Sequence, residues 1–133
     1  MVAHRMHAGL ADYLARNNVS ENGQHDNGSV HLVFDNQYRI AFTAASNGAL
    51  LLESRVCELP VDRITRQSCL ISLLEKAGDE MYVQMASLVL PQDGNLLTVQ
   101  QLISAEAGIQ EFEQFLEKFI NLLAGYRSLA GVL

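Results

Sequence analysis

The sequence predicts an α+β protein in which helices pack a twisted antiparallel sheet, with the elements in the order α-βββ-α-ββ-α. Apolar residues recur every three or four positions near the start, in the middle and at the end of the chain, which is typical of amphipathic helices. Between these segments, short apolar runs are separated by turn-forming residues, as in hairpins. The 133 residues are 49% hydrophobic and 18% charged, so we expect residues 1–133 to fold as one domain around one core.

Composition and charge exclude several classes of protein. A net charge of −6 repels phosphate backbones, so we expect no nucleic-acid partner. No apolar run approaches the roughly 18 residues of a membrane span, and Asp12 interrupts the apolar stretch that a signal peptide would need. Cys57 and Cys69 have no Cys-x-x-Cys partner, which argues against a zinc site or a disulfide framework. We therefore expect a cytoplasmic protein without membrane insertion.

The first predicted helix has apolar residues at helical spacing over about four turns and stops at Asn17-Asn18. These apolar residues are Val2, Met6, Leu10, Tyr13 and Leu14. The following segment, residues 17–29, is rich in Asn, Ser and Gly, which favour turns, so we expect a loop there.

The stretch SVHLVFDNQYRIAFTA, residues 29–44, predicts two strands whose apolar triplets share one face of the sheet. A two-residue turn would pair Phe34 with Arg39 and split the triplets between the faces, because a one-residue slip inverts every side chain. We therefore predict a three-residue connection, residues 35–37. It pairs Phe34 with Tyr38, Leu32 with Ile40 and Val30 with Phe42.

A third strand follows the turn signal SNG at residues 46–48 and completes a meander. Its best face carries Leu50, Leu52 and Val56. The other side of the meander is mixed, with a modest apolar strip, and we expect it to be half exposed. Its residues are His31, Val33, Asp35, Arg39, Ala41, Thr43, Leu51, Glu53 and Arg55.

A second helix is predicted between an N-cap at Asp62 and a stop at Gly78. Its apolar residues extend around more than one stripe, which indicates contacts on two sides. They are Ile64, Cys69, Leu70, Ile71, Leu73, Leu74 and Ala77.

A second hairpin is predicted around Asp93-Gly94, a strong type I′ turn signal. A two-residue turn there pairs Leu90 with Leu97 and Leu88 with Val99 on one face, and Val89 with Thr98 and Met85 with Leu102 on the other. Strands with one wet face usually alternate apolar and polar residues, so we expect this hairpin to be covered on both faces.

The last helix is predicted to begin at an N-cap, Ser104, and to carry a broad apolar face. A heptad seam would fit the spacing, but a stripe this wide favours a helix lying across a sheet. The face comprises Ile109, Phe112, Phe115, Leu116, Phe119, Leu122, Leu123, Tyr126 and Leu129.

Residues with catalytic or metal-binding chemistry do not form a recognisable set. His4 and His7 lie three apart, but no His-Glu-x-x-His motif accompanies them. The loop GQHDNGS, residues 23–29, lacks the Lys and the following helix of a phosphate-binding loop. Cys69 on an apolar helix is typical of a small core residue. We therefore expect no enzyme activity, no metal and no cofactor.

The element order and two stretches resemble the class I chaperones of bacterial type III secretion. LVLPQDGNLLTVQQL, residues 88–102, is similar to the strand, Asp/Gly turn and strand of that family. SAEAGIQEFEQFLEKFINLLAGYRSL, residues 104–129, is similar to its amphipathic final helix. LLEKAG departs from the family, whose members often carry an Asn after the leucine pair. The resemblance implies a homodimer that holds the N-terminal segment of a secreted effector in extended form, ready for export.

We expect the first and last helices to cover the inward triplets of the meander, which leaves its other side free. The resemblance also implies two sets of site residues. The effector would bind to the first helix and to the outer side of the meander, through Met6, Leu10, Leu14, Val33, Ala41 and Leu51. The dimer interface would be formed by the second helix and second hairpin, through Leu70, Ile71, Leu74, Met85, Val89 and Leu102. Two alternatives stay open: a regulator of the same fold that sequesters another cytoplasmic protein, and a small-molecule enzyme or sensor that uses His25.

Overall fold

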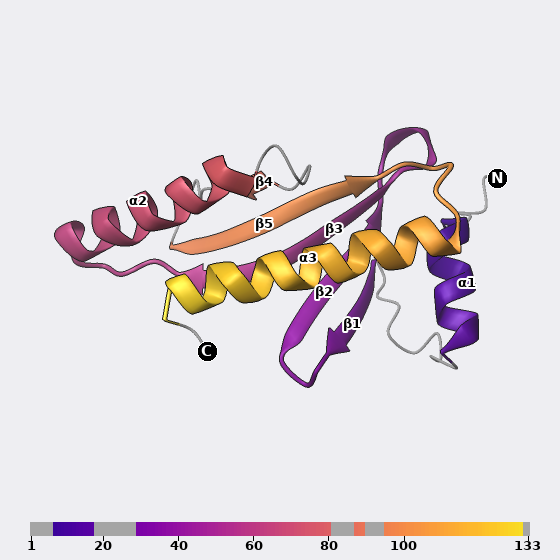
Figure 1. The fold of residues 1–133 in the computed structure, drawn as a ribbon, viewed down its shortest axis with the longest axis horizontal. Helices are drawn as coiled ribbons and strands as arrows, with labels where there is room; N and C mark the ends of the chain where they lie inside the picture. The colour runs from indigo at the N-terminus through magenta and orange to yellow at the C-terminus, as the bar shows by residue number, and fades with distance from the viewer. Residues whose placement is uncertain (1–6, 18–28, 81–86, 90–94, 132–133) are drawn as a thin grey trace. The chain divides into compact units, whose positions relative to one another are not determined.

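The computed structural model describes residues 7–17, 29–80, 87–89 and 95–131, and of residues 77–80 it describes only the backbone. Among these residues the strands form one five-stranded sheet in the order β1-β2-β3-β5-β4. The predicted α+β class and element order are confirmed. The elements drawn in Figure 1 are α1 (Ala8–Arg16), β1 (Val30–Phe34), β2 (Tyr38–Ala44), the short 3-10 turn η2 (Ser46–Gly48), β3 (Leu50–Glu58), α2 (Arg63–Glu80), β4 (Ser87–Val89), β5 (Leu96–Ile103) and α3 (Ile109–Leu129).

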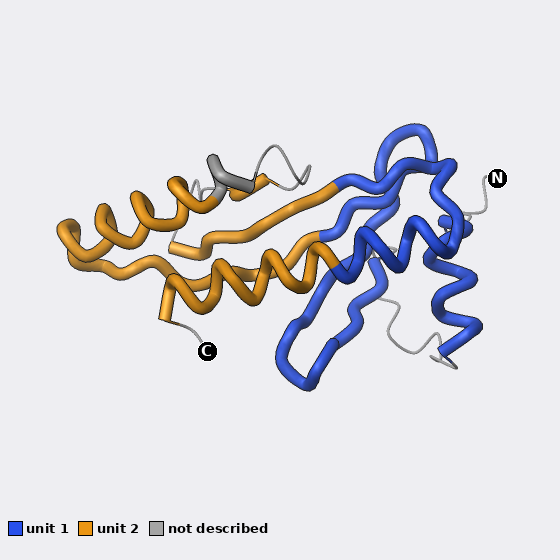
Figure 2. Tube along the Cα trace, viewed as in Figure 1, with its two compact units in different colours: residues 1–52, 102–117 blue, residues 53–101, 118–133 orange. Residues whose placement is uncertain are grey.

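The chain divides into two compact units, which Figure 2 shows in different colours. Unit 1 comprises residues 1–52 and 102–117, and unit 2 comprises residues 53–101 and 118–133. The boundary falls within β3, β5 and α3, so each unit holds a part of these elements. Unit 1 holds α1 and the β1–β2 hairpin, whereas unit 2 holds α2 and β4.

The β1–β2 hairpin of unit 1 has the predicted register and the predicted three-residue connection. Asp35 and Asn36 adopt left-handed backbone conformations with φ of 52° and 58°, which Asp and Asn tolerate better than most residues. The Gln37 N–H donates to the Phe34 carbonyl oxygen at 3.0 Å and closes the turn. The predicted partners are all present: Val30 with Phe42, Leu32 with Ile40, and Phe34 with Tyr38.

An aromatic cluster joins this hairpin to α1 and to the first turns of α3. The centroid of the Phe112 ring lies 6.0 Å from that of Phe42 and 5.4 Å from that of Tyr13. The Tyr13 ring in turn lies 6.4 Å from Phe34. A Cβ atom at Gly9 would lie 2.9 Å from the Cβ of Phe112, so this close approach of α1 requires glycine. Since aromatic pairs stabilise beyond the area they bury, the cluster anchors α1 on the apolar face of the hairpin.

The N-terminus of α1 is capped by a histidine, and the helix starts later than the apolar pattern predicts. His7 is the N-cap, so the helix begins at residue 8, while residues 1–6 lie outside the described part. The His7 Nδ1 atom accepts from the N–H groups of Gly9 at 3.1 Å and Leu10 at 3.4 Å. Its Nε2 atom lies 2.7 Å from the Ser104 carbonyl oxygen. One neutral ring with its proton on Nε2 satisfies all three contacts and ties α1 to the segment before α3.

The end of α1 is where the sequence predicts it, but the start of α3 is not. Asn17 is the C-cap of α1, as predicted. Ser104 does not cap α3, which begins five residues later, at Ile109. Instead the Ser104 hydroxyl accepts from the Glu106 N–H at 3.2 Å, and its carbonyl accepts from the Ala107 N–H at 3.1 Å. Such local hydrogen bonds of serine compete with helix formation, so a separate turn precedes α3.

The core of unit 2 draws buried side chains from β3, the β3–α2 connection, α2, β5 and α3. These are Val56, Cys57, Leu59, Leu73, Leu97, Val99, Phe119, Leu122, Leu123 and Tyr126. In the β4–β5 pair the predicted register is confirmed, because Leu88 pairs with Val99 and Val89 with Thr98. The turn at residues 93–94, and Met85 and Leu90 of the other predicted pairs, lie outside the described residues.

The start of α2 is as predicted, whereas its end is not. The Asp62 Oδ2 atom accepts from the Thr65 N–H at 2.9 Å and from the Thr65 hydroxyl at 2.7 Å, so Asp62 is the N-cap. These hydrogen bonds lower the pKa of the Asp62 carboxyl. The predicted stop at Gly78 is wrong, because α2 continues to Glu80. Glycine inside a helix costs only about 1 kcal/mol relative to alanine, so it does not by itself end one.

Candidate binding surfaces

The side of the sheet opposite the aromatic cluster carries four apolar residues in unit 1, which we call the reverse face. Val33 is 60% exposed and Leu102 is 58% exposed, while the other two are partly exposed. Alternate residues of each strand point into the core, so these four point away from it. The reverse face consists of Val33 on β1, Ala41 on β2, Leu51 on β3 and Leu102 on β5.

Leu102 lies on the reverse face, whereas the family resemblance implies a place for it in the dimer interface. The Gln100 Nε2 atom donates to the Glu53 carboxylate at 2.5 Å, which places both side chains on the same side of the neighbouring strands β5 and β3. Residues two apart on a strand share a face, so Leu102 shares the side of Gln100, and Leu51 shares that of Glu53. Leu102 therefore extends the apolar strip that the sequence predicts from Val33, Ala41 and Leu51.

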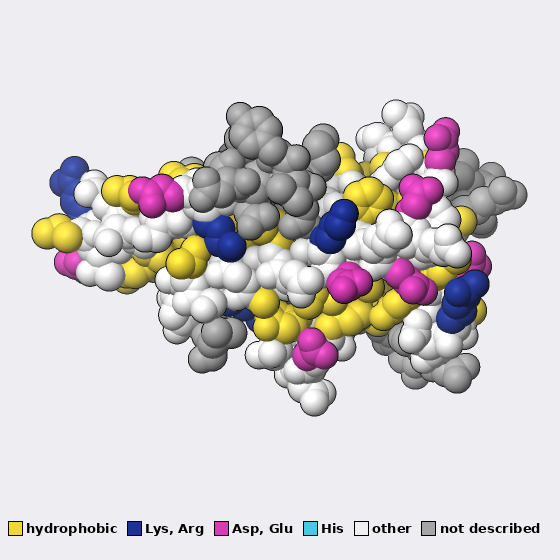
Figure 3. Space-filling view, viewed as in Figure 1, with side chains coloured by type: hydrophobic (Ala, Val, Ile, Leu, Met, Phe, Trp, Pro, Cys, Tyr) yellow, Lys and Arg dark blue, Asp and Glu magenta, His cyan; other side chains and the backbone are white. Residues whose placement is uncertain are grey.

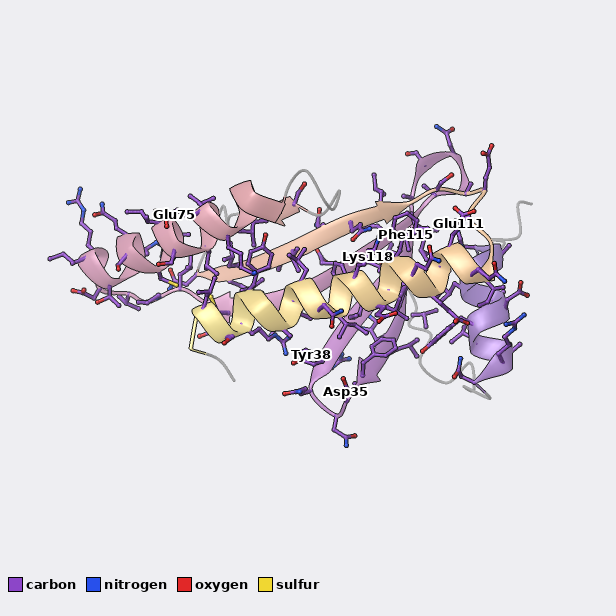
Figure 4. All side chains as sticks on the ribbon, viewed as in Figure 1. Asp35, Tyr38, Glu75, Glu111, Phe115 and Lys118 are labelled. Atoms are coloured by element: carbon purple, nitrogen blue, oxygen red, sulfur yellow. The ribbon has the colours of Figure 1, made fainter. Side chains whose placement is uncertain are left out.

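Polar groups border the reverse face and are satisfied there. The hydroxyls of Ser29 and Thr43 share a hydrogen bond of 2.8 Å. Figure 4 shows Asp35 at the tip of the β1–β2 hairpin, where its side chain is exposed. An apolar strip bordered by satisfied polar groups can bury a partner's apolar side chains without leaving polar groups unpaired.

A second exposed apolar surface runs along α2, and we call it the α2 stripe. Its residues are Ile64, Leu70, Ile71 and Leu74, which fall on one side of the helix. Ile64 is 78% exposed, Ile71 57% and Leu74 49%, and Leu70 is partly exposed. Leu73, toward the opposite side of α2, is fully buried. The broad apolar pattern of α2 therefore places one side in the core and leaves another in solvent, and Figure 3 shows hydrophobic side chains on that surface.

Exposure of the α2 stripe to water is unfavourable. Complete burial of a Val, Leu or Ile side chain stabilises by about 1.5–3 kcal/mol. Burial of the exposed parts of Ile64, Ile71, Leu74 and of Val61, which is 87% exposed, would therefore contribute about 4–8 kcal/mol before the entropy cost of association. β4 contacts α2, and Val89 on β4 is partly exposed.

The residues of α1 proposed for effector binding do not offer a free surface. Leu10 is 2% exposed and Leu14 is 7% exposed, so both side chains belong to the core of unit 1. The single apolar stripe of α1 packs against the aromatic cluster, which leaves little exposed apolar area on this helix for a partner. Met6, like Met85 of the proposed dimer set, lies outside the described residues.

Two residues of the exposed surface were missed as site residues. Val61 precedes α2, and Ile64 begins its stripe. The signal for Ile64 was its seven-residue spacing from Ile71, which places both on one side of a helix. No sequence signal distinguishes Val61 from an isolated surface residue.

The described part of the chain holds no group of three or more His, Cys, Asp or Glu side chains that could bind a metal ion. None of its helices is long and apolar enough to cross a membrane. The ring of His7 is committed to its helix cap, and His4 and His25 lie outside the described residues.

Comparisons with known proteins agree with this fold. The family model of the Tir chaperone protein (CesT) family matches residues 10–127. A search of curated proteins finds no match.

Several solved structures superpose on the chain. A chain of the ExsC–ExsE complex has a TM-score of 0.68 at 19% identity, covering 92% of this chain and 90% of that chain. A chain of the HopA1–SchA chaperone–effector complex has a TM-score of 0.65 at 17% identity, covering 88% of each chain. A chain of the ExoU–SpcU complex from the type III secretion system of Pseudomonas aeruginosa has a TM-score of 0.66 at 13% identity, covering 92% and 95%. At such identities the likeness shows the fold.

Proposed function

The chain belongs to the Tir chaperone protein (CesT) family, and we propose that it is a type III secretion chaperone that binds the N-terminal segment of a secreted effector. The effector segment is held in extended form, which keeps it stable and competent for export. The chaperone acts by binding alone, in the bacterial cytoplasm, without covalent chemistry or a cofactor.

The reverse face is the observation that supports this proposal most directly. Its apolar residues lie on β1, β2, β3 and β5, so an extended segment crossing the strands can place side chains against each in turn. β1 is an edge of the described sheet, and an edge strand presents a row of backbone N–H and C=O groups to an added strand. An extended segment uses both features, because side chains supply apolar contacts while its backbone continues the sheet. We propose Val33, Ala41, Leu51 and Leu102 as effector contacts, with Met6 from residues 1–6.

The similar solved structures also support the proposed chaperone function. The HopA1–SchA structure is a chaperone–effector complex, and ExoU–SpcU comes from a type III secretion system. Both have this fold at TM-scores of 0.65 and 0.66.

We also propose that the chaperone is a homodimer joined through the α2 stripe. A two-fold interface buries the same patch of both subunits, so each exposed side chain of the stripe is covered twice per dimer. Stable interfaces bury about 1,600 Å² in total, or about 800 Å² per subunit, which exceeds the exposed area of the four side chains of the stripe, so the strand beside α2 has to contribute. The proposed interface residues are Leu70, Ile71, Leu74, Met85 and Val89, together with Ile64.

The test compares Val33→Asp with a matched control, Leu129→Asp. Both wild-type side chains are more than half exposed, at 60% and 51%, but Leu129 lies near the end of α3 and not on the reverse face. Tagged chaperone is purified from its own bacterium, and the attached proteins are quantified by mass spectrometry. We expect Val33→Asp to lower the recovered secreted protein at least about tenfold, because a carboxylate replaces an apolar side chain that the bound effector would bury.

Leu129→Asp should recover as much of the secreted protein as wild type. Equal recovery by Val33→Asp would show that the reverse face does not bind the effector. Recovery of a transcription-control protein and of no secreted protein would instead favour the regulatory alternative.

A further inference from the structure

The inward side of β1 carries apolar side chains that the core of unit 1 covers only in part. Ile40 and Tyr38 on β2 are 0% and 6% exposed, whereas their partners on β1, Leu32 and Phe34, are partly exposed. Because β1 is an edge of the described sheet, these two side chains have a neighbouring strand on one side only. The inward side of the sheet is therefore open to a partner at β1.

Tyr13 on α1 adds an aromatic ring to this open side and is itself partly exposed. The centroid of its ring lies 6.4 Å from that of Phe34 and 5.4 Å from that of the fully buried Phe112. We call Tyr13, Leu32 and Phe34 the aromatic edge. Rings held against a packed core lose little freedom on binding, so the aromatic edge can take up an apolar side chain at low entropy cost.

Two glutamates of α3 project toward the hairpin side of that helix. Figure 4 shows Glu111 and Phe115 on the flank of α3 that lies away from the tip of the β1–β2 hairpin. Glu113 follows Glu111 by two residues, or roughly 200° of helix rotation, so it projects from the opposite flank, and Glu117 follows it there one turn later. Both are exposed, and Figure 3 shows acidic side chains beside a hydrophobic band along this flank. In agreement, burial and then the negative charge of Glu113 raise the pKa of the Tyr13 hydroxyl.

The other charges next to the aromatic edge leave it negative. Asp12 precedes Tyr13 on α1 and Asp35 follows Phe34 at the hairpin tip, and both are exposed. We call Asp12, Asp35, Glu113 and Glu117 the acidic rim. Arg16, one turn further along α1, supplies one positive charge against these four carboxylates. Residues 18–28, which follow α1 in the chain, contain Glu21 and Asp26 but no Lys or Arg, so their charge does not complement the rim.

We propose that the effector segment adds to β1 as a further strand, places an apolar side chain against the aromatic edge and pairs a Lys or Arg with the acidic rim. This inference rests on the proposed effector binding and names the chemistry of the bound segment. Successive side chains of an added strand point to opposite sides of the sheet, so one set meets the reverse face at Val33 and the other meets the aromatic edge. On each side the side chains are about 7 Å apart. A basic residue two positions from the inward apolar residue therefore lies beside the rim, and the net charge of −6 attracts such a segment.

The experiment reverses one charge of the acidic rim and compares it with a matched control. Glu113→Lys and Glu111→Lys make the same change at exposed positions of the same helix, but only Glu113 belongs to the rim. Tagged chaperone is purified from its own bacterium at low salt, the attached secreted protein is quantified by mass spectrometry, and thermal unfolding checks that each variant is folded. We expect Glu113→Lys to lower the recovered secreted protein at least about tenfold, because it sets like charges against each other. Glu111→Lys should recover as much as wild type.

The salt dependence of recovery gives a second readout. Added salt screens the attraction in the wild-type complex, so recovery should fall, whereas for Glu113→Lys it screens a repulsion, so recovery should rise. Wild-type recovery and salt response in Glu113→Lys would overturn the inference, as would equal losses in Glu113→Lys and Glu111→Lys. Val33→Asp, measured beside them, keeps the two proposals apart. If Val33→Asp loses the secreted protein while Glu113→Lys retains it, effector binding to the reverse face stands and this inference alone fails.

Discussion

Substitution of Ile71 by aspartate tests the α2 stripe as the dimer interface. Ile71 is 57% exposed in the single chain, so burial of that part stabilises a dimer by about 1–1.5 kcal/mol per copy. A carboxylate at an apolar interface costs a further 1–3 kcal/mol or so because it loses water without gaining a partner. A two-fold interface contains the substitution twice, so the total loss is at least about 4 kcal/mol. The dissociation constant of the dimer should therefore rise about 1,000-fold.

Sedimentation velocity over a concentration series measures this constant, and thermal unfolding checks that the fold is retained. Since Ile71 is more than half exposed, its replacement should change the free energy of unfolding of the single chain by no more than about 0.5 kcal/mol. Ser72→Asp is the matched control, because it adds the same charge one residue further on, at an exposed position outside the stripe. Sedimentation of Ile71→Asp as a dimer with the wild-type dissociation constant would refute the assignment of the stripe. A wild-type protein that stays monomeric at high concentration would refute the dimer itself.

Three further substitutions probe the fold and the surfaces. His7→Ala removes the cap of α1 and its link to Ser104, so it should lower the free energy of unfolding by about 1–2 kcal/mol in denaturant titrations, whereas Asp12→Ala on the exposed side of α1 should not. Asp62→Ala should be destabilised relative to wild type at neutral pH. Because folding lowers the pKa of Asp62, that stability difference should persist above the ordinary Asp pKa and vanish as the pH falls through the lowered value. Leu102→Asp should weaken effector recovery and leave the dimer dissociation constant unchanged; the opposite result would restore Leu102 to the dimer interface.

The register of the first hairpin could be predicted because a wrong register has a large physical cost. Shifting it by one residue would expose Ile40 and Phe42, which are 0% and 1% exposed, and bury Arg39. The pairing of Leu88 with Val99 in the second hairpin was predicted in another way, from the two-residue turn expected at Asp93-Gly94. Alternation of side chains along a strand is fixed by backbone geometry. The apolar pattern of the sequence therefore shows which side chains share a face of the sheet, without knowledge of the rest of the fold.

Helix ends were harder to predict because they depend on single hydrogen bonds. Serine is a common N-cap and histidine is not. The sequence therefore predicted Ser104 as the N-cap of the last helix and gave no sign that His7 caps the first. In the structure the His7 ring is held in its capping position because the Ser104 carbonyl oxygen accepts a hydrogen bond from Nε2, the ring nitrogen that does not cap the helix. Residues 7 and 104 are far apart in the chain. A cap that needs a partner from a distant segment leaves no local signal.

Assignment of the apolar surfaces met a related difficulty, because a helix stripe looks the same whether it faces a core or a partner. Leu10 and Leu14 have helical spacing like that of the α2 stripe, yet the aromatic cluster around Phe112 takes up the stripe of α1. In α2 the apolar residues occupy more of the circumference than one contact can cover, so burial of Leu73 leaves Ile64 and Ile71 in solvent. The width of an apolar pattern, compared with the width that one neighbour can cover, is therefore the better sequence signal for a surface that needs a partner.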